Sequence, residues 1–132
     1  IAGTQYIGLP SLSKIKLFGD NPYSYGNLPK ALHSVGKHAV VLLTHNPVVW
    51  SREVIQKYPF VSLTLAGHTH AGQMGLYWNK YKNQAAEYDS KTKAGLFRYN
   101  NQYLYINAGI GTSAIHSRFL ILPEVTLITL HN

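Results

Sequence analysis

Short apolar runs separated by polar turns dominate the middle of the chain. Residues 38–44 form a continuous apolar run rich in valine, and residues 61–66 form a second one. Runs of this length and composition predict strands that are covered on both faces. Between them, Asn46-Pro47 opens a helix that ends near Lys57, because a first-turn proline has no amide hydrogen to lose and Tyr58-Pro59 disfavours continuation. The pattern therefore predicts a strand–helix–strand unit with two parallel strands.

Two further pairs of strands are expected in the last third of the chain. Residues 96–99 and 102–107 predict a hairpin around Asn100-Asn101, because Asn tolerates the positive φ of a tight turn. Arg118–Leu122 and Val125–Leu130 predict two more strands. We expect the strand–helix–strand unit to lie in one mixed sheet and these four strands in another.

One helix and one long loop complete the pattern. Asn27-Leu28-Pro29 combines a capping residue with a first-turn proline, and the helix is expected to end near Val35. Residues 68–95 show no convincing period, and a loop of this length usually has a function. Within it, the aromatic residues and lysines at 77–82 suit either a membrane interface or an ordinary exposed loop.

The composition limits the class of protein. With 132 residues the chain is one modest domain or part of one, and 45% apolar with 13% charged residues is typical of a chain that folds. No apolar run reaches the roughly 18 residues of a membrane-spanning helix. Zero cysteines exclude disulfides, zinc–thiolate sites and cysteine nucleophiles. The first residues lack an initiator Met and a basic region, so we do not expect a natural amino terminus there.

The net charge of +7 results from 12 basic and 5 acidic side chains and favours an anionic partner. A phosphate ester, a nucleic acid and an acidic lipid surface all fit this charge. The charge does not choose among them. The compartment stays open between the cytoplasm and the surface of a membrane.

Histidines are placed where the two buried strands end. Gly67-His68-Thr69-His70 directly follows the second strand, and His45 follows the first. Because the carboxyl ends of adjacent parallel strands meet at one edge of a sheet, the rings of His45, His68 and His70 are expected to converge there. Such a turn can serve two metal ions, and Mn, Fe, Zn or Ni would suit these ligands. The other histidines lack such a setting and are predicted to be structural or solvent-facing: His33, His38, His116 and His131.

Five features are specific in combination: His45, Gly67-His68-Thr69-His70-Ala71-Gly72-Gln73, Tyr105–Ser113, Arg118 and Pro123–Leu130. On these residues the chain, from about Leu28 onward, resembles the calcineurin-like metallophosphoesterases. The resemblance points to the bacterial branch that includes UDP-2,3-diacylglucosamine pyrophosphatases and membrane-associated phosphodiesterases. It implies an α/β fold, namely half of a four-layer α/β/β/α sandwich with mixed sheets.

The resemblance also implies roles for the three histidines. His45 and His68 would bind the second of two divalent metal ions, and His70 would bind the first. The two ions would activate a hydroxide for the hydrolysis of a phosphodiester or a pyrophosphate. Arg118, Gln73 and, near the second loop, Asn107 are candidate contacts to substrate. A solvated strand-edge side chain is an equal alternative for Arg118.

Three metal-binding blocks of the family are absent: the Asp-x-His, the Gly-Asp-x-x-Asp and the Gly-Asn-His block. Gly19-Asp20-Asn21 is not the second block, because Tyr23 stands where that block requires Asp. Residues 1–132 are therefore expected to be the carboxyl-terminal half of one domain, to contain no catalytic residue and to be nearly inactive alone. The expected partners are the amino-terminal half or a second copy of the chain, with an anionic phosphate ester, which can be lipid-linked, as substrate.

Three other functions have less support in the sequence. Residues 109–114 match a dinucleotide-binding fingerprint, but that site requires a helix there and more strand–helix units than the remaining residues can form. A basic nucleic-acid-binding module fits the charge and the tyrosines, although no recognition motif supports it and no specific nucleic acid is expected. Serine hydrolysis lacks a Gly-x-Ser-x-Gly motif. The nucleic-acid module is kept as the alternative to a phosphoesterase.

Overall fold

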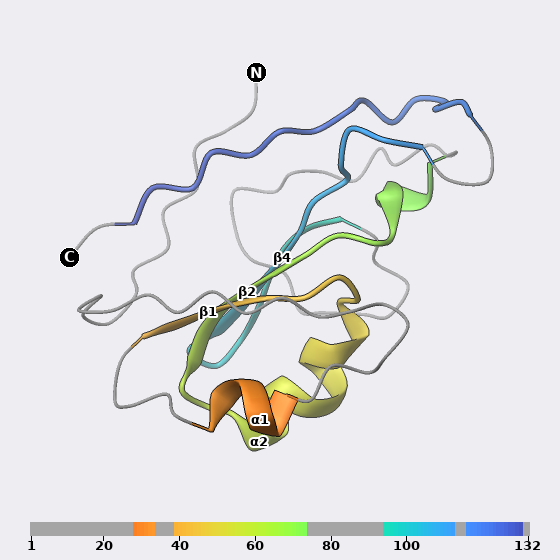
Figure 1. The fold of residues 1–132 in the computed structure, drawn as a ribbon. Coiled ribbons are helices and arrows are strands. Elements are labelled where there is room, and N and C mark those ends of the chain that lie inside the picture. Colours follow the sequence, from red (N-terminus) through yellow and green to blue (C-terminus); the bar gives the residue numbers. More distant parts are fainter. Residues whose placement is uncertain (1–27, 34–38, 74–93, 113–115, 131–132) are drawn as a thin grey trace.

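The computed structural model describes residues 28–33, 39–73, 94–112 and 116–130. Their centre is one four-stranded mixed sheet, with the strand order β1-β2-β4-β3 (Figure 1). The strands β1, β2 and β4 run parallel to one another, and β3 runs antiparallel to β4. Their bounds are β1 Val40–Leu43, β2 Val61–Ala66, β3 Gly95–Tyr99 and β4 Gln102–Ile106. The architecture is an α/β fold with few helices.

Of the helical segments in the described ranges, the first three pack on one face of the sheet, and the last forms the turn after β2, where Ala71 packs with Ala108 and Ile121. In chain order they are α1 (Leu28–Leu32), η1 (Trp50–Val54), α2 (Ile55–Lys57) and η2 (His70–Gly72). The segment η1, a π-helical turn, runs directly into α2, and together they join β1 to β2. The predicted strand–helix–strand unit is therefore confirmed, and its helix ends at Lys57 as predicted. The predicted start of the first helix is also confirmed.

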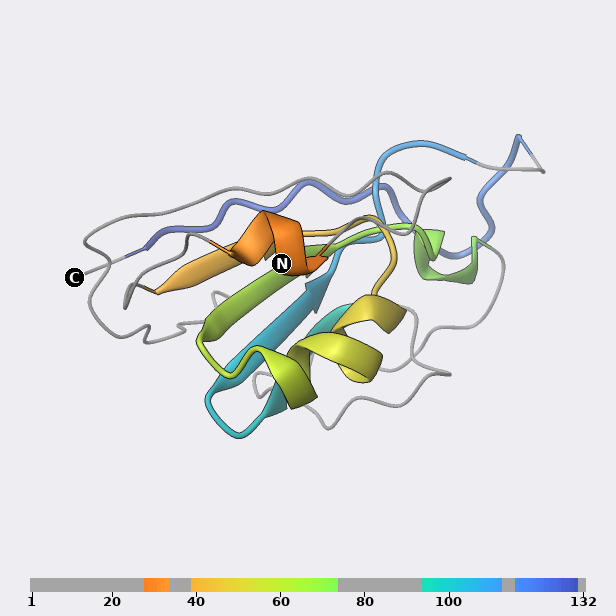
Figure 2. The ribbon, with the colours of Figure 1, turned by 60° about the horizontal axis from the view of Figure 1, so that its bottom comes forward.

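The core lies between this helical layer and the sheet (Figure 2). Trp50 and Val54 of η1 pack in one cluster with Leu104 and Ile106 of β4. Leu104 lies opposite Thr64 in the register between β2 and β4. Since side chains alternate along a strand, Tyr105 points to the other face of the sheet. An extended segment, residues 116–130, runs along that face (Figure 1).

The placement of the hairpin in a second sheet was wrong. The hairpin of β3 and β4 is confirmed, but β4 pairs with β2, with Leu63 opposite Tyr103 and Ala66 opposite Ile106. The apolar alternation of a hairpin shows which face is buried and does not show which edge it joins. Here the buried side chains of β4 continue the apolar face that β1 and β2 begin.

The strands predicted at Arg118–Leu122 and Val125–Leu130 are also wrong. Residues 116–130 are extended but form no strand. Phe119 makes a single bridge, and the N–H groups of Phe119 and Glu124 donate to the carbonyls of Gln73 and Gly109. A β-strand is defined by a neighbour that completes its hydrogen bonds. Large apolar side chains of the segment are exposed: Phe119, Leu120, Leu122, Val125, Leu127 and Ile128.

Some sequence predictions concern residues outside the described ranges. These are the aromatic and lysine stretch at 77–82, the rejected Gly19-Asp20-Asn21 block, and the settings of His38 and His131. The first helix ends at Leu32, before the predicted end near Val35, and His33 is already in a turn. No helix begins in residues 107–112, where a dinucleotide fingerprint would require one.

Candidate metal centre

The turn that follows β2 has an unusual backbone. His68, His70, Ala71 and Gln73 have φ values of 67°, 49°, 52° and 56°. L-residues rarely adopt positive φ, although His does so more readily than most. Each such residue costs on the order of 1–3 kcal/mol, and such strain clusters at functional sites. The turn therefore qualifies as a candidate site on backbone geometry alone.

Thr69 stabilises this turn from within. Its side-chain Oγ1 accepts the N–H of Ala71 at 3.4 Å, and its carbonyl accepts the N–H of Gly72 at 2.8 Å. The N–H of Gln73 donates to the carbonyl of His70 at 2.9 Å. These bonds close η2 and fix the direction of the two histidines that flank Thr69.

His45 and His68 meet at the carboxyl edge of the sheet. The two residues follow the adjacent parallel strands β1 and β2, and the N–H of Gly67 donates to the carbonyl of His45 at 3.3 Å. His68 Nδ1 lies 2.9 Å from His45 Nε2, and the ring centroids are 4.8 Å apart at an interplanar angle of 72°. The structure thus brings together two of the three predicted ligands.

His70 turns toward a different loop. Its Nδ1 lies 3.3 Å from the carbonyl oxygen of Gly111, in the loop that follows β4. Among the described residues, no group of three or more His, Cys, Asp or Glu side chains stands close enough to hold a metal ion. The expected meeting of all three rings therefore does not extend to His70, and the role of these histidines as metal ligands stays a prediction.

The His45 and His68 nitrogens lie close to the spacing that a shared cation requires. Histidine nitrogens bind zinc at about 2.0–2.1 Å, so two of them in the tetrahedral arrangement usual for zinc lie about 3.3 Å apart. The observed separation of 2.9 Å is that of a hydrogen bond between the two rings, and a small rotation of either ring would open it to the spacing of a shared ion. Both residues are exposed, so an ion can reach them from solvent. These two histidines alone cannot complete a metal site, which would need further ligands.

The candidate substrate contacts Arg118 and Gln73 are used within the protein. Arg118 Nε donates to the carbonyl of Gly111 at 2.9 Å, and its Nη2 donates to that of Ala108 at 2.9 Å. Gln73 is buried, and its Nε2 donates to the carbonyl of Ser117 at 2.9 Å. Both side chains tie loops together at the edge where the histidines lie.

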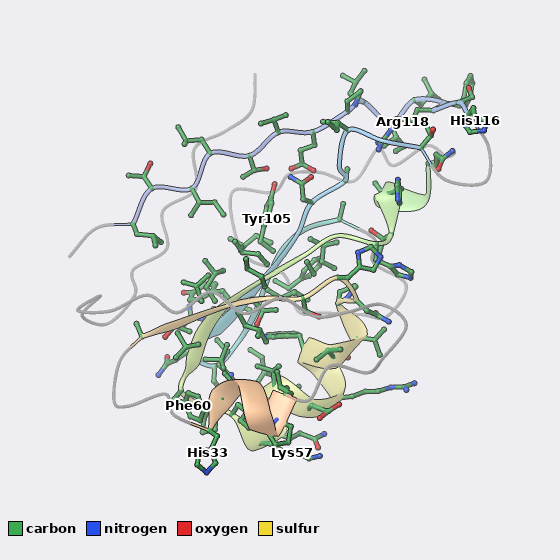
Figure 3. The ribbon with its side chains drawn as sticks, viewed as in Figure 1. His33, Lys57, Phe60, Tyr105, His116 and Arg118 are labelled. Carbon is green, nitrogen blue, oxygen red and sulfur yellow. The ribbon has the colours of Figure 1, made fainter. Side chains whose placement is uncertain are left out.

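Asn107 belongs to a polar network around Glu124. Asn107 Oδ1 accepts the N–H of Gly109 at 2.6 Å, and its Nδ2 donates to Thr126 Oγ1 at 2.9 Å. The Glu124 carboxylate accepts the N–H of Ala108 at 2.7 Å, and Oγ1–H of Thr126 at 3.1 Å. The Tyr105 hydroxyl also donates to Glu124. This network anchors the extended segment to the loop after β4. Figure 3 shows Tyr105 pointing toward the extended segment.

Sequence reasoning gave Glu124 no role. The available signal was an acidic residue, one of five in the chain, placed directly after Pro123 in a segment predicted to be strand. Its partners Ala108 and Tyr105 are 16 and 19 residues away along the chain. No local pattern identifies them.

Removing the Glu124 carboxylate should destabilise the fold. In Glu124→Ala the buried N–H of Ala108 loses its acceptor, which is expected to lower the free energy of unfolding by about 1–3 kcal/mol in urea titrations. Glu124→Gln should retain most of that stability, because its amide oxygen can face Ala108 while the hydroxyls of Tyr105 and Thr126 rotate to accept. Equal losses in both variants would contradict the assigned role.

The other described histidines lie apart from the pair. His33 follows α1 at the helical side of the molecule, and His116 begins the extended segment (Figure 3). Both are exposed, as predicted.

Membrane-spanning helices are absent from the described part of the chain, where every helix is too short to cross a bilayer.

Comparison with known proteins shows similarity to metallophosphoesterases. Over 91 residues the chain is 33% identical to the uncharacterised metallophosphoesterase YkuE of Bacillus subtilis, with 68% of this chain and 30% of that protein covered. Over 109 residues it is 33% identical to the phosphodiesterase YaeI of Escherichia coli, with coverage of 83% and 35%. A bovine transmembrane protein with a metallophosphoesterase domain is 31% identical over 106 residues, with coverage of 79% and 22%.

These similarities support assignment of the chain to the calcineurin-like metallophosphoesterases. No family model and no solved structure matches the chain. The chain spans about a third of the length of the first two curated relatives.

Proposed function

We propose that the chain supplies part of the metal site of a phosphoesterase that hydrolyses a phosphodiester or a pyrophosphate. The observation that carries this proposal is the 2.9 Å approach of the His45 and His68 ring nitrogens at the end of two parallel strands. Relatives that are named metallophosphoesterase and phosphodiesterase support it. The strained backbone of the turn that carries His68 is the second support.

His45 and His68 would hold one divalent ion, and His70 would contribute to a second. Mn, Fe, Zn and Ni all accept imidazole ligands. When bound, a pair of such ions supplies Lewis acidity toward the phosphate oxygens and an activated water near neutral pH. The chain's own residues orient the ligands, since η2 and the loop after β4 fix the direction of His70. The remaining ligands would come from the amino-terminal half of the enzyme.

The amino-terminal half of the enzyme would also cover the extended segment, residues 116–130. Val125 and Leu127 are 87% and 91% exposed, whereas Glu124 and Thr126, which alternate with them, face the sheet through the polar network. An extended segment that is polar inward and apolar outward favours burial against further protein. We place it in the second sheet of a four-layer α/β/β/α sandwich, which the amino-terminal half would complete.

The substrate is expected to be an anionic phosphate ester. The net charge of +7 favours such a ligand. A lipid-linked substrate, as in the UDP-2,3-diacylglucosamine pyrophosphatase branch, belongs to the same proposal. Arg118, Gln73 and Asn107 stay candidates for substrate contact at this edge of the sheet, and their present hydrogen bonds would have to be shared with it.

Reconstitution tests the function directly. The chain alone is expected to show no hydrolysis of a phosphodiester with added manganese, and mixing with the amino-terminal half of a homologous enzyme should restore it. Leu127→Lys should weaken the restoration, whereas Lys57→Ala, on the exposed end of α2, should not. Turnover by the pure chain as a monomer would contradict the proposal, and turnover by a dimer would identify a second copy as the partner.

The alternative function has a different signature. A basic nucleic-acid-binding module would bind arbitrary DNA with strong salt dependence, and chelators would leave that binding unchanged. Such binding without restored hydrolysis would favour the module over the phosphoesterase.

A further inference from the structure

Residues 117–119 clip two loops together at the edge that carries the histidines. Gln73, at the end of the turn after β2, donates from Nε2 to the carbonyl of Ser117 at 2.9 Å. The N–H of Phe119 donates back to the carbonyl of Gln73 at 3.1 Å. The clip therefore fixes the far end of the turn that carries His70.

Arg118, the central residue of the clip, holds the second loop. Its Nε donates to Gly111 at 2.9 Å, its Nη2 donates to Ala108 at 2.9 Å, and Nη2 also reaches the carbonyl of Gly111. Its Nη1 is buried and has no hydrogen-bond partner among the described residues. Figure 3 shows Arg118 beside the loop that follows β4. The guanidinium thus faces the backbone of this protein.

The Gly111 carbonyl that Arg118 holds is the one that His70 contacts. A carbonyl oxygen only accepts hydrogen bonds, so His70 Nδ1 must carry the proton in this contact of 3.3 Å. The neutral ring then has its lone pair on Nε2. Metal-binding histidines commonly donate their other ring N–H to a backbone carbonyl, which fixes the tautomer and orients the ring.

We propose that Arg118 is a positioning residue for His70. By holding the Gly111 carbonyl in place, Arg118 keeps the proton of His70 on Nδ1 and leaves Nε2 available to a metal ion. The consequence for metal binding rests on the proposed function. The tautomer itself is a property of this chain and can be measured without any metal.

This role depends on the shape of the guanidinium. Arginine presents several donors in a rigid plane and can bond two carbonyls at once, whereas lysine presents one compact ammonium. Arg118→Lys therefore keeps the charge and loses the bridge between Ala108 and Gly111. A residue that only neutralised a substrate phosphate would keep much of its effect as lysine.

The experiment is a nitrogen-15 NMR measurement of the histidine rings in the 132-residue chain, under conditions in which His70 is neutral. His70→Ala identifies the His70 signals. The wild-type chain is expected to show His70 protonated on Nδ1, and Arg118→Lys should shift it toward the Nε2-protonated form. Arg52→Lys, on the exposed side of η1, is the matched control and should leave His70 unchanged.

Two results would overturn the positioning role. One is a wild-type His70 that is protonated on Nε2, which requires no variant to observe. The other is an unchanged His70 tautomer in an Arg118→Lys chain whose backbone amide spectrum shows an intact sheet. A failed fold in this variant leaves the wild-type result to decide.

Zinc titration separates this inference from the proposed function. In the chain combined with an amino-terminal half, Arg118→Lys is expected to lower zinc affinity about 10–100-fold, as is usual for outer partners of metal-binding histidines. If zinc perturbs no histidine signal while the tautomer is as expected, the metal function fails and the positioning of His70 stands. If Arg118→Lys shifts the tautomer and leaves zinc affinity unchanged, the inferred consequence for the metal is refuted. A raised KM with normal zinc affinity and tautomer would instead make Arg118 a substrate contact.

Discussion

Leu104→Ala is expected to lower the free energy of unfolding by about 4 kcal/mol, within the range found for buried leucines. Leu104 is 0% exposed and lies in β4, between β2 and β3. Its side chain packs in the cluster that contains Trp50 of η1 and Phe97 of β3. Truncation therefore leaves a cavity where the helical layer meets the sheet, and neighbours from three elements cannot all move to fill it.

The measurement is urea unfolding followed by tryptophan fluorescence. Leu122→Ala is the matched control, because Leu122 is 82% exposed and its truncation should change stability by less than about 0.5 kcal/mol. Similar losses in both variants would show that Leu104 is not in the main core.

His45→Ala is expected to lower the zinc affinity of the reconstituted enzyme by at least about 100-fold. Outer partners of a metal-binding histidine already contribute 10–100-fold, and removal of the ligand itself should cost no less. Isothermal titration calorimetry measures the change. His33→Ala is the control, because His33 is exposed and lies near the helices, away from the pair.

A double-mutant cycle makes this prediction sharper. If His45 and His68 bind the same ion, the double replacement should cost much less than the sum of the single ones, because the second loss removes a ligand from a site already broken. Additive losses would contradict a shared ion, and unchanged zinc affinity in all variants would show that the 2.9 Å contact is an ordinary hydrogen bond between two rings.

Local sequence patterns predicted the first parallel pair of strands and the hairpin. The valine-rich run of β1, the helix opened by Asn46-Pro47 and the run of β2 carry their structure in neighbouring residues. The meeting of His45 and His68 follows from the same logic, because adjacent parallel strands end at the same edge. These features depend on backbone preferences and on burial patterns that span only a few residues.

The chain's final segment shows where such reasoning stops. Residues 118–122 and 125–130 have the composition of strands, yet in the described part of the chain no strand lies beside them to complete a ladder. Their position is set by Arg118 and Glu124, whose side chains bind backbone groups 7 to 16 residues earlier. The Gly111 carbonyl that His70 contacts lies 41 residues away along the chain.

The sequence by itself determined the strand–helix–strand unit, the hairpin and the pair of histidines at one edge, because each depends on periodicity or on strand order. Only the tertiary structure decided that β4 joins β2, that His70 turns to Gly111, and that Arg118 bonds the loop after β4. The physical reason is that edge choice and side-chain partners depend on distant groups competing for the same surface. Such competition leaves no trace in the local order of residues.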